Sequence, residues 1–320
     1  MRALILKSLL VAGLFGAAGA HAQSTAFPGA KPISFVIPFA AGGSTDTLGR
    51  QFATRLGTAL ATNVIVENRT GGSGTVGGAY VAAAPADGYT VLLGVDTSIL
   101  TRHLEGLKYD GERDFKPLGM IAITPVSIAA GPQVPVQSFR ELVALVRANP
   151  GKFDYGTSGV GGTAHLIGSM LKRDGGMDMV HVPYKSGSQA IQDILGGRVP
   201  LVITAPISVS QTPQIRVLAV FTDTRIPTLP NVPTAKEEGV PIAISSVFGV
   251  FAPAATPQPV VNTLNQAIAK VAMDEGFRAE ISKGGFVPAT DPSVAHLAKL
   301  VAEGNANMEA AFKSLGIKPE

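Results

Sequence analysis

Short runs of β-branched and other apolar residues alternate along the chain with longer stretches of helical periodicity. In the first third, apolar runs predict strands at Ile33–Pro38, Asn63–Glu67 and Thr90–Gly94, with helices near residues 46–61 and 77–84 between them. Strands that alternate with helices are typical of α/β layers built on a parallel sheet. The hydrophobic pattern therefore predicts an α/β fold.

The same alternation returns after residue 115. Ser138 and Glu141 form a capping box that opens a helix, and Asp291-Pro292 is a second helix start, with Asp291 as the N-cap. The strands predicted in this part are 118–123, 126–130, 153–156, 179–182, 201–204, 216–221 and 248–252, and the helices begin near Ser138, Thr163, Ser188, Thr234, Pro257 and Pro292.

These elements group into two βαβ-rich blocks, at about 30–124 and 125–245, followed by a helical tail. We expect the tail to complete the first block. Lobe one would then comprise residues 23–124 plus 246–320, and lobe two residues 125–245. The chain would cross between the lobes twice, near Thr124-Pro125 and Ser245-Ser246, and paired crossings of this kind act as a hinge.

The first 22 residues have the pattern of a cleavable signal peptide. Arg2 and Lys7 precede an apolar core at Leu9–Ala20, and Ala20-His21-Ala22 is a small-x-small cleavage pattern. The core is too short to span a membrane, which takes about 20 apolar residues. The alternatives are an uncleaved anchor or a buried helix. The signal-peptide interpretation places the mature protein in the periplasm.

Composition excludes several classes of function. Of 26 basic side chains, Arg2 and Lys7 leave with the signal peptide, and the remaining 24 nearly balance 23 acidic ones. A balanced charge gives no basis for a nucleic-acid partner. The chain has no cysteine, which excludes disulfides, thiol catalysis and cysteine-bound zinc, and it has no tryptophan on which a sugar could stack.

Glycine-rich turns fall between a strand and a helix at Pro38–Asp46, Asn68–Gly74 and Gly156–Thr163. Ligands of open α/β sheets bind outside the carboxyl ends of the strands, where such turns gather. Glycine lets the backbone approach a ligand, and the free N–H groups of the following helix receive an anion. A carboxylate needs no Arg or Lys there. Each turn alone can also be an ordinary tight turn, but the first and third open the two blocks in parallel positions and predict a shared cleft.

The second turn also matches a dinucleotide motif, through Gly72, Gly74 and Gly77, with Asp96 at the end of the next strand as the ribose-binding carboxylate. Pro85 cuts the following helix short, which disfavours this interpretation. We expect no cofactor.

Catalytic groups are scarce. Ser158, His165 and Asp46 could form a triad across the cleft, but Val160 breaks the nucleophile-elbow spacing and no other spacing supports the set. The histidines show no helical zinc pair, so we expect no metal. Asp46 has two interpretations that stay open: it caps its helix, or it contacts ligand or water.

At these residues the sequence resembles the Bug family, the TctC-like solute receptors of tripartite tricarboxylate transporters. The similarity runs in family order over nearly the whole mature chain. The matching segments are 38–46, 66–69, 86–90, 155–166, 181–185, 193–199, 232–234 with 238–239, and 252–265.

The resemblance implies a two-lobed periplasmic-binding-protein fold, the Venus flytrap, with a mixed sheet and flanking helices in each lobe and no enzymatic activity. It also implies that backbone amides and hydroxyls of the turns after each lobe's first strand hold a carboxylate. Carried over to this chain, the binding residues are Phe39, Ala40, Gly42, Gly43, Ser44 and Asp46 in lobe one, and Thr157, Ser158, Gly161 and Thr163 in lobe two. We add the hypothesis that Ser127, Thr204 and Ala205 tune which solute fits.

Several positions depart from the family pattern. Ala41 and Thr70 stand where proline is usual, and Thr204-Ala205-Pro206 replaces a different stretch near the ligand side. The solute therefore stays open among dicarboxylates, aromatic acids, amino acids and nicotinate-like acids. We expect a monomer that delivers its solute to membrane transporter subunits. The alternatives are a soluble sensor that presents its ligand to a membrane kinase, and an exported hydrolase or oxidoreductase.

Overall fold

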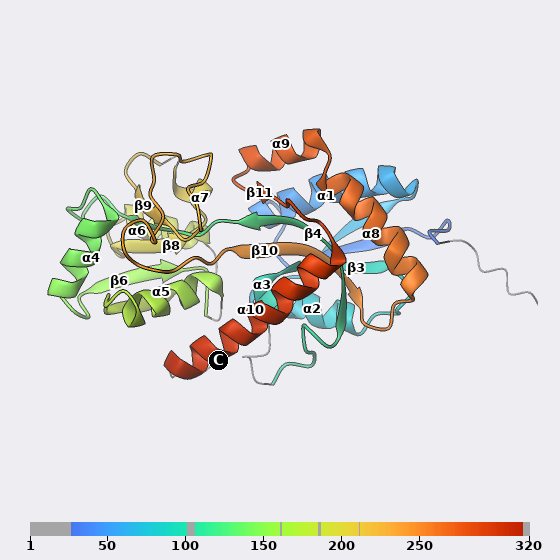
Figure 1. Ribbon diagram of the computed structural model, residues 1–320, viewed down its shortest axis with the longest axis horizontal. Coiled ribbons are helices and arrows are strands. Elements are labelled where there is room, and N and C mark those ends of the chain that lie inside the picture. The colour runs from blue at the N-terminus through green and yellow to red at the C-terminus, as the bar shows by residue number, and fades with distance from the viewer. Residues whose placement is uncertain (1–26, 101–105, 161, 185–186, 211, 316–320) are drawn as a thin grey trace, which may run out of the picture.

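The computed structural model describes residues 27–100, 106–160, 162–184, 187–210 and 212–315 (Figure 1). The expected signal peptide and Gly161 lie outside these residues. The described chain forms two α/β lobes, each with a mixed sheet flanked by helices, which confirms the predicted fold class. No described helix is both long enough and apolar enough to cross a membrane.

Lobe one is built on a six-stranded sheet in the order β11-β4-β10-β3-β1-β2. Its strands are β1 (Ile33–Ile37), β2 (Val64–Asn68), β3 (Thr90–Val95), β4 (Phe115–Thr124), β10 (Ser246–Pro253) and β11 (Val287–Pro288). β1 runs parallel to β2 and β3, whereas β10 is antiparallel to β3 and β4. β10, which comes from the last quarter of the chain, thus lies in the sheet between β3 and β4, two strands from its first half.

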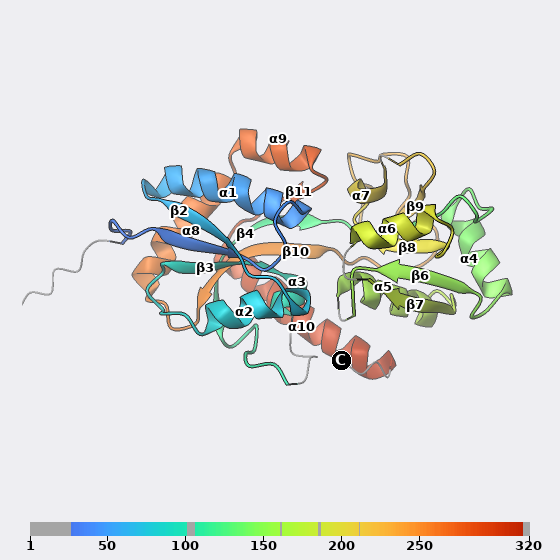
Figure 2. The same ribbon diagram turned by 180° about the vertical axis from the view of Figure 1, so that it is seen from behind.

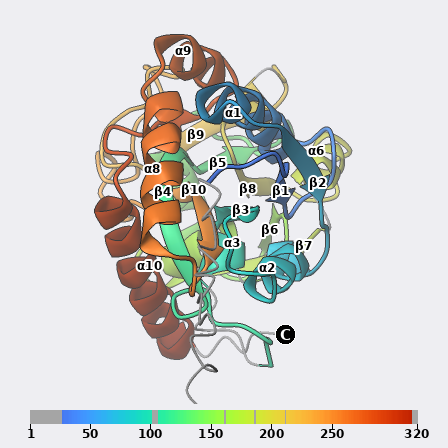
Figure 3. The same ribbon diagram turned by 90° about the vertical axis from the view of Figure 1, so that its right-hand side faces the viewer.

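Helices cover both faces of this sheet. On one face α1 (Ser44–Leu60), α8 (Gln258–Ala272) and α9 (Glu275–Lys283) enclose an apolar core around Phe35, Phe52 and Phe277. On the other face lie α2 (Thr75–Ala82), α3 (Asp96–Ile99) and α10 (Val294–Leu315). In Figure 3, α8 and α10 lie beside the part of the sheet that β4 and β10 form, each on its own face.

Lobe two is built on a five-stranded sheet in the order β7-β6-β8-β5-β9. Its strands are β5 (Ser127–Ala130), β6 (Phe153–Thr157), β7 (Met179–Pro183), β8 (Leu201–Thr204) and β9 (Arg216–Val220). β6 is parallel to β7 and β8, and β5 is antiparallel to β8 and β9. Core residues of α4 (Phe139–Ala148) and α5 (Thr163–Arg173) pack on one face, and those of α6 (Gly187–Leu195) and α7 (Ile207–Ser210) pack on the other.

The chain crosses between the lobes at two adjacent places. β4 ends at Thr124, and β10 begins at Ser246, which pairs with Thr124 across the ladder. On the lobe-two side, the Ile244 N–H donates to the carbonyl of Phe221, whose own N–H donates to the carbonyl of Val126. The two crossings are therefore held to each other by backbone hydrogen bonds.

Three helix predictions need correction. The helix expected at Thr234 is a single turn, which ends at Gly239 with φ +87° although its capping-box bonds form. The helix predicted to run to Asp274 stops at Ala272, and Asp274 instead caps a separate helix, α9. α10 begins at Val294 after Ser293, whose hydroxyl accepts from the His296 N–H, rather than after Asp291.

Candidate functional site

The first and third glycine-rich turns lie where the two lobes meet. The first follows β1 and opens α1, and the third follows β6 and opens α5. Their closeness rests on a bond between the lobes: the Thr163 hydroxyl at the start of α5 donates to Asp96, which follows β3. Because β1 and β3 are neighbouring parallel strands, their carboxyl ends share the edge that faces lobe two (Figure 2).

Both helices start without a side-chain cap. The N-caps are Gly43 for α1 and Gly162 for α5, and neither can supply a hydroxyl or carboxylate to the first N–H groups. The first N–H to bond within α1 belongs to Thr47, and the first within α5 belongs to Leu166. The preceding N–H groups of each helix have no intrahelical acceptor, so each helix presents a partial positive charge at its start.

Asp46 anchors the first turn. Its carboxylate is only 3% exposed and accepts hydrogen bonds from the Gly42 N–H, the Arg50 Nε and the Asn68 Nδ2, at 2.9, 2.9 and 2.8 Å. Burial raises the pKa of Asp46, but these hydrogen bonds outweigh burial and hold it below its ordinary value. Every one of these contacts lies within lobe one, so they favour an anchoring role over direct ligand contact.

The rest of the first turn faces solvent. Ala40, Gly42, Gly43 and Ser44 are exposed, and Gly42 has φ +83°, a conformation that glycine adopts without strain. Phe39 differs, because its ring packs against the lobe-one core and its carbonyl accepts from Asn68 at 2.9 Å. Ala40, Gly43 and Ser44 offer backbone amides and Ser44 one hydroxyl, whereas the Gly42 N–H is already bonded to Asp46 and Phe39 serves the protein's own packing.

In the second glycine-rich turn, glycine serves close packing. A Cβ on Gly77 would lie 2.7 Å from the Cβ of Pro38, and one on Gly74 would lie 3.3 Å from the Phe39 ring. The residues of the dinucleotide motif therefore bring α2 against the end of β1, and Asp96 bonds to Thr163 instead of standing free for a ribose.

Thr157, in the third turn, is committed internally. It is 1% exposed, its hydroxyl donates to the carbonyl of Gly159 at 2.9 Å, and its oxygen lies 2.7 Å from the Nε2 of His181. Since the single hydroxyl proton goes to Gly159, His181 must donate from Nε2. Ser158 next to it is exposed.

A stacked histidine pair supports this turn. The rings of His165 and His181 lie 4.0 Å apart at 12°, and Phe312 meets His165 edge-on at 5.9 Å. Burial lowers the pKa of His165, and burial together with the neighbouring His165 lowers the pKa of His181 to about 4. Both rings are therefore neutral at pH 7. Asp46 is bound to Arg50 and His165 is stacked on His181, so these two members of the considered triad serve separate structural contacts.

The three residues proposed to tune specificity lie at strand ends in lobe two. Ser127 is fully buried, and its hydroxyl donates to the carbonyl of Thr204 at 3.0 Å, across the β5–β8 pair. Thr204 and Ala205 are half-buried. The Ser127 hydroxyl thus fixes the end of β8.

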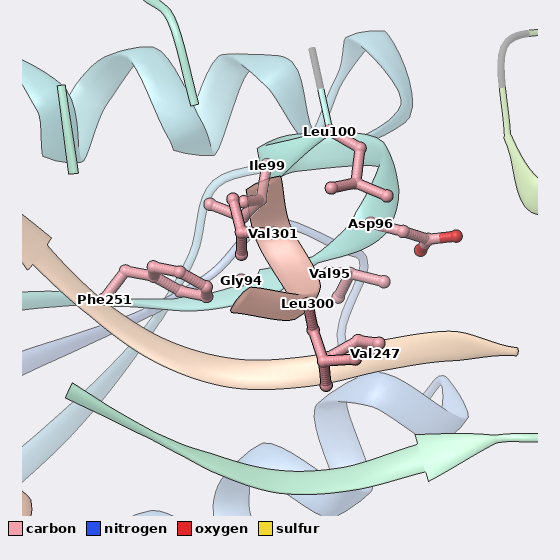
Figure 4. Close-up of a pocket in the computed structure, with 9 residues that line it drawn as sticks. All are labelled: Gly94, Val95, Asp96, Ile99, Leu100, Val247, Phe251, Leu300 and Val301. Atoms are coloured by element: carbon pink, nitrogen blue, oxygen red, sulfur yellow. The ribbon is translucent and has the colours of Figure 1, made fainter. Parts of the chain in front are cut away.

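The remaining features of the described part of this region concern metal binding and cavities. No group of three His, Asp or Glu residues within it could hold a metal ion. Beside Asp96 lies a small apolar cavity of about 20 Å³, enough for about one water molecule. Its walls include Val95, Ile99, Val247 and Leu300 (Figure 4). It belongs to the packing beneath α10.

Comparisons with known proteins agree with this geometry. The sequence profile of the tripartite tricarboxylate transporter family receptor matches residues 48–317. Protein BugT of Bordetella pertussis is 32% identical, over 86% of this chain and 88% of that protein. Among solved structures, one from R. palustris with adipate has a TM-score of 0.82 and 32% identity, covering 92% of this chain and all of that one. MatC from Rhodopseudomonas palustris with bound malate has a TM-score of 0.78 and 27% identity, covering 88% and 98%.

Proposed function

The chain belongs to the Bug family, the receptors of tripartite tricarboxylate transporters, and from this premise we propose that it holds a small carboxylate-bearing solute between its two lobes. Members of this family are periplasmic solute receptors that work with membrane transporter subunits. The proposal is that this chain delivers its solute to such subunits and catalyses no reaction.

The pair of uncapped helix starts carries the proposal. α1 and α5 come from different lobes, both follow a glycine N-cap without a side-chain bond, and both begin where the lobes meet. Free N–H groups and the helix dipole favour an anion at such a start. A carboxylate placed between the two starts would be attracted by both lobes, and a ligand that contacts both lobes favours their closure.

The relatives with adipate and with malate direct the choice of solute toward dicarboxylates. The hydroxyls of the exposed residues Ser44 and Ser158 would add one donor from each lobe. Both amides and hydroxyls recognise the carboxylate itself, whereas the rest of the solute must meet Thr204, Ala205 and their surroundings. We therefore propose a carboxylate as the shared feature of all ligands, with dicarboxylates as the first class to test.

Finer features of the proposal follow from the chain's organisation. Lobe one comprises residues 23–124 plus 246–320 and lobe two residues 125–245, with the hinge at the two crossings. Residues 1–22 direct export and are removed. The receptor works as a single copy, which analytical ultracentrifugation of the purified mature chain tests directly.

Thermal-shift measurements with paired ligands test the function. The mature chain is unfolded and refolded to remove any bound solute, then titrated with adipate, malate, benzoate, aspartate and nicotinate. Adipamide and nicotinamide serve as neutral controls of matched shape. A ligand at about a hundred times its Kd stabilises the folded state by about 2.7 kcal/mol, which raises the melting temperature by several degrees.

We expect at least one carboxylate to raise the melting temperature and its neutral amide to leave it unchanged. Equal shifts with acid and amide, or shifts with uncharged sugars alone, would contradict recognition of a carboxylate by the helix starts.

A further inference from the structure

The start of α5 is tied to lobe one by a buried carboxylate. Asp96 directly follows β3 and is 4% exposed, and its Oδ2 accepts a hydrogen bond from the hydroxyl of Thr163, which is also 4% exposed. The same oxygen accepts from the Ser246 hydroxyl at 3.1 Å, where β10 begins at the hinge. One carboxylate oxygen thus joins lobe one, lobe two and a hinge strand.

The neighbourhood of Asp96 fixes its direction. Its backbone lies beside the small apolar cavity, among Val95, Leu100 and Val247, and its carboxylate points away from these side chains (Figure 4). Apolar side chains occupy one side of Asp96, beneath α10, and its carboxylate is directed to the other side, where Thr163 and Ser246 donate to it.

Asp96 also suits the electrostatics of α5. The N-cap of α5 is Gly162, which has no side chain, and Thr163 is the first helical residue. An acidic group at a helix start is stabilised by the free N–H groups and the dipole. Here the acidic group comes from the other lobe, so its stabilisation depends on how the lobes are placed.

A second lobe-one element holds the same helix. Met308 and Phe312 of α10 pack against Leu166 of α5, and all three side chains are 3% exposed. Phe312 also contacts His165, one ring of the pair that supports Thr157. Asp96 therefore holds the start of α5 and α10 packs along its side, although α5 itself is part of lobe two.

We propose that Asp96 is a positioning residue that fixes the start of α5 against lobe one and limits rotation of the lobes about the hinge. It thereby sets the separation of the two helix starts. That the helix starts receive a carboxylate rests on the proposed function, but the restraint on the lobes acts without any ligand.

The restraint is measured as a distance between the lobes. The chain has no cysteine, so Thr58→Cys on α1 and Lys152→Cys before β6, both exposed, give two unique sites for spin labels. In the ligand-free protein, Asp96→Ala should broaden the distribution of label distances relative to the unsubstituted protein. Thr163→Val, which removes the donor, should broaden it similarly, and Thr163→Ser should restore it.

Ligand affinity supplies the second measurement, with adipate and malate as probes. Because Asp96 acts through α5, Asp96→Ala should weaken both by the same factor, about tenfold for a lost hydrogen bond to a charged group. Asp96→Asn keeps an acceptor and should recover most of the loss. The double variant with Thr163→Val should be no weaker than Asp96→Ala alone.

A distance distribution unchanged by both Asp96→Ala and Thr163→Val would overturn the proposal. A changed ratio of adipate to malate affinity would also overturn it, because it would show that Asp96 contacts the ligand. If neither acid binds the unsubstituted protein, the proposed use of these acids fails, while the distance measurement still decides the role of Asp96.

Discussion

Acidification should weaken the fold through the stacked histidine pair. The pKa of His181 is about 4 in the folded protein, against 6.5 for an ordinary histidine. The fold therefore favours the neutral ring. The preference for the neutral His181 ring contributes fully to the free energy of unfolding above pH 6.5. This contribution is lost as the pH falls toward about 4, because the unfolded chain takes up the proton first.

The size of the stability loss follows from how far the pKa of His181 is lowered in the folded protein. Between neutral pH and about pH 4.5, a shift of this size corresponds to at most about 2.5 kcal/mol. The ring is partly exposed, so solvent screening reduces the expected loss to about 1–2 kcal/mol. Protonation would also place a charge 4.0 Å from the His165 ring, and buried His165 responds to acid in the same direction.

Urea unfolding of the protein and of His181→Gln at neutral pH and about pH 4.5 measures the loss. Glutamine can still donate to the Thr157 hydroxyl oxygen but does not titrate, which makes it the matched control. Buried carboxylates such as Asp46 titrate in both proteins and cancel in the comparison. Equal losses in the two proteins would refute the assignment of this pH dependence to His181.

Two further substitutions test other contacts. The Thr124 hydroxyl is buried without a hydrogen-bond partner in the described structure, so Thr124→Val should stabilise the protein by about 0.5–1.5 kcal/mol in urea unfolding; a loss of stability would show that the hydroxyl is satisfied. Asn68→Ala removes the bonds to Phe39 and Asp46 that shape the first turn and should weaken carboxylate binding about tenfold by calorimetry; unchanged affinity would mean that the turn holds its shape without them.

Local sequence signals predicted those elements whose causes are local. Half of the predicted capping box forms at Ser138: the Glu141 N–H donates to the Ser138 hydroxyl at 3.2 Å, but the Glu141 carboxylate accepts from the Gln137 N–H and not from that of Ser138. At Thr234 both bonds of the same signal form, yet no helix follows, because the chain turns at Gly239 after one turn. A capping pattern specifies how a helix can start, while the length of the helix depends on its later residues and on packing.

The glycine-rich turns were found for the same reason, since a glycine before a helix is visible in the sequence. The roles of individual polar residues were not, because their partners are distant in the chain. Thr157 is engaged by His181 and Thr163 by Asp96, which is 67 residues away. The only sequence pattern that includes Asp96 is the dinucleotide motif, and no local pattern indicates that Asp96 joins the two lobes.

The central claim, that backbone amides at the helix starts hold the carboxylate, is tested most directly at Ser44. Ser44 is the first residue of α1 and follows Gly43 at φ −77° and ψ 168°, an extended conformation that suits the residue before proline. Proline is favoured at this helix position, so Ser44→Pro removes the N–H while the helix start is kept. Ser44→Ala is the control, because it removes the hydroxyl and keeps the N–H.

The measurement is the calorimetric affinity of both variants for the carboxylate that binds the unsubstituted protein best. We predict that Ser44→Pro binds it at least about tenfold more weakly than Ser44→Ala, with equal stability in urea. Equal affinity of the two variants would contradict the claim that this amide holds the carboxylate.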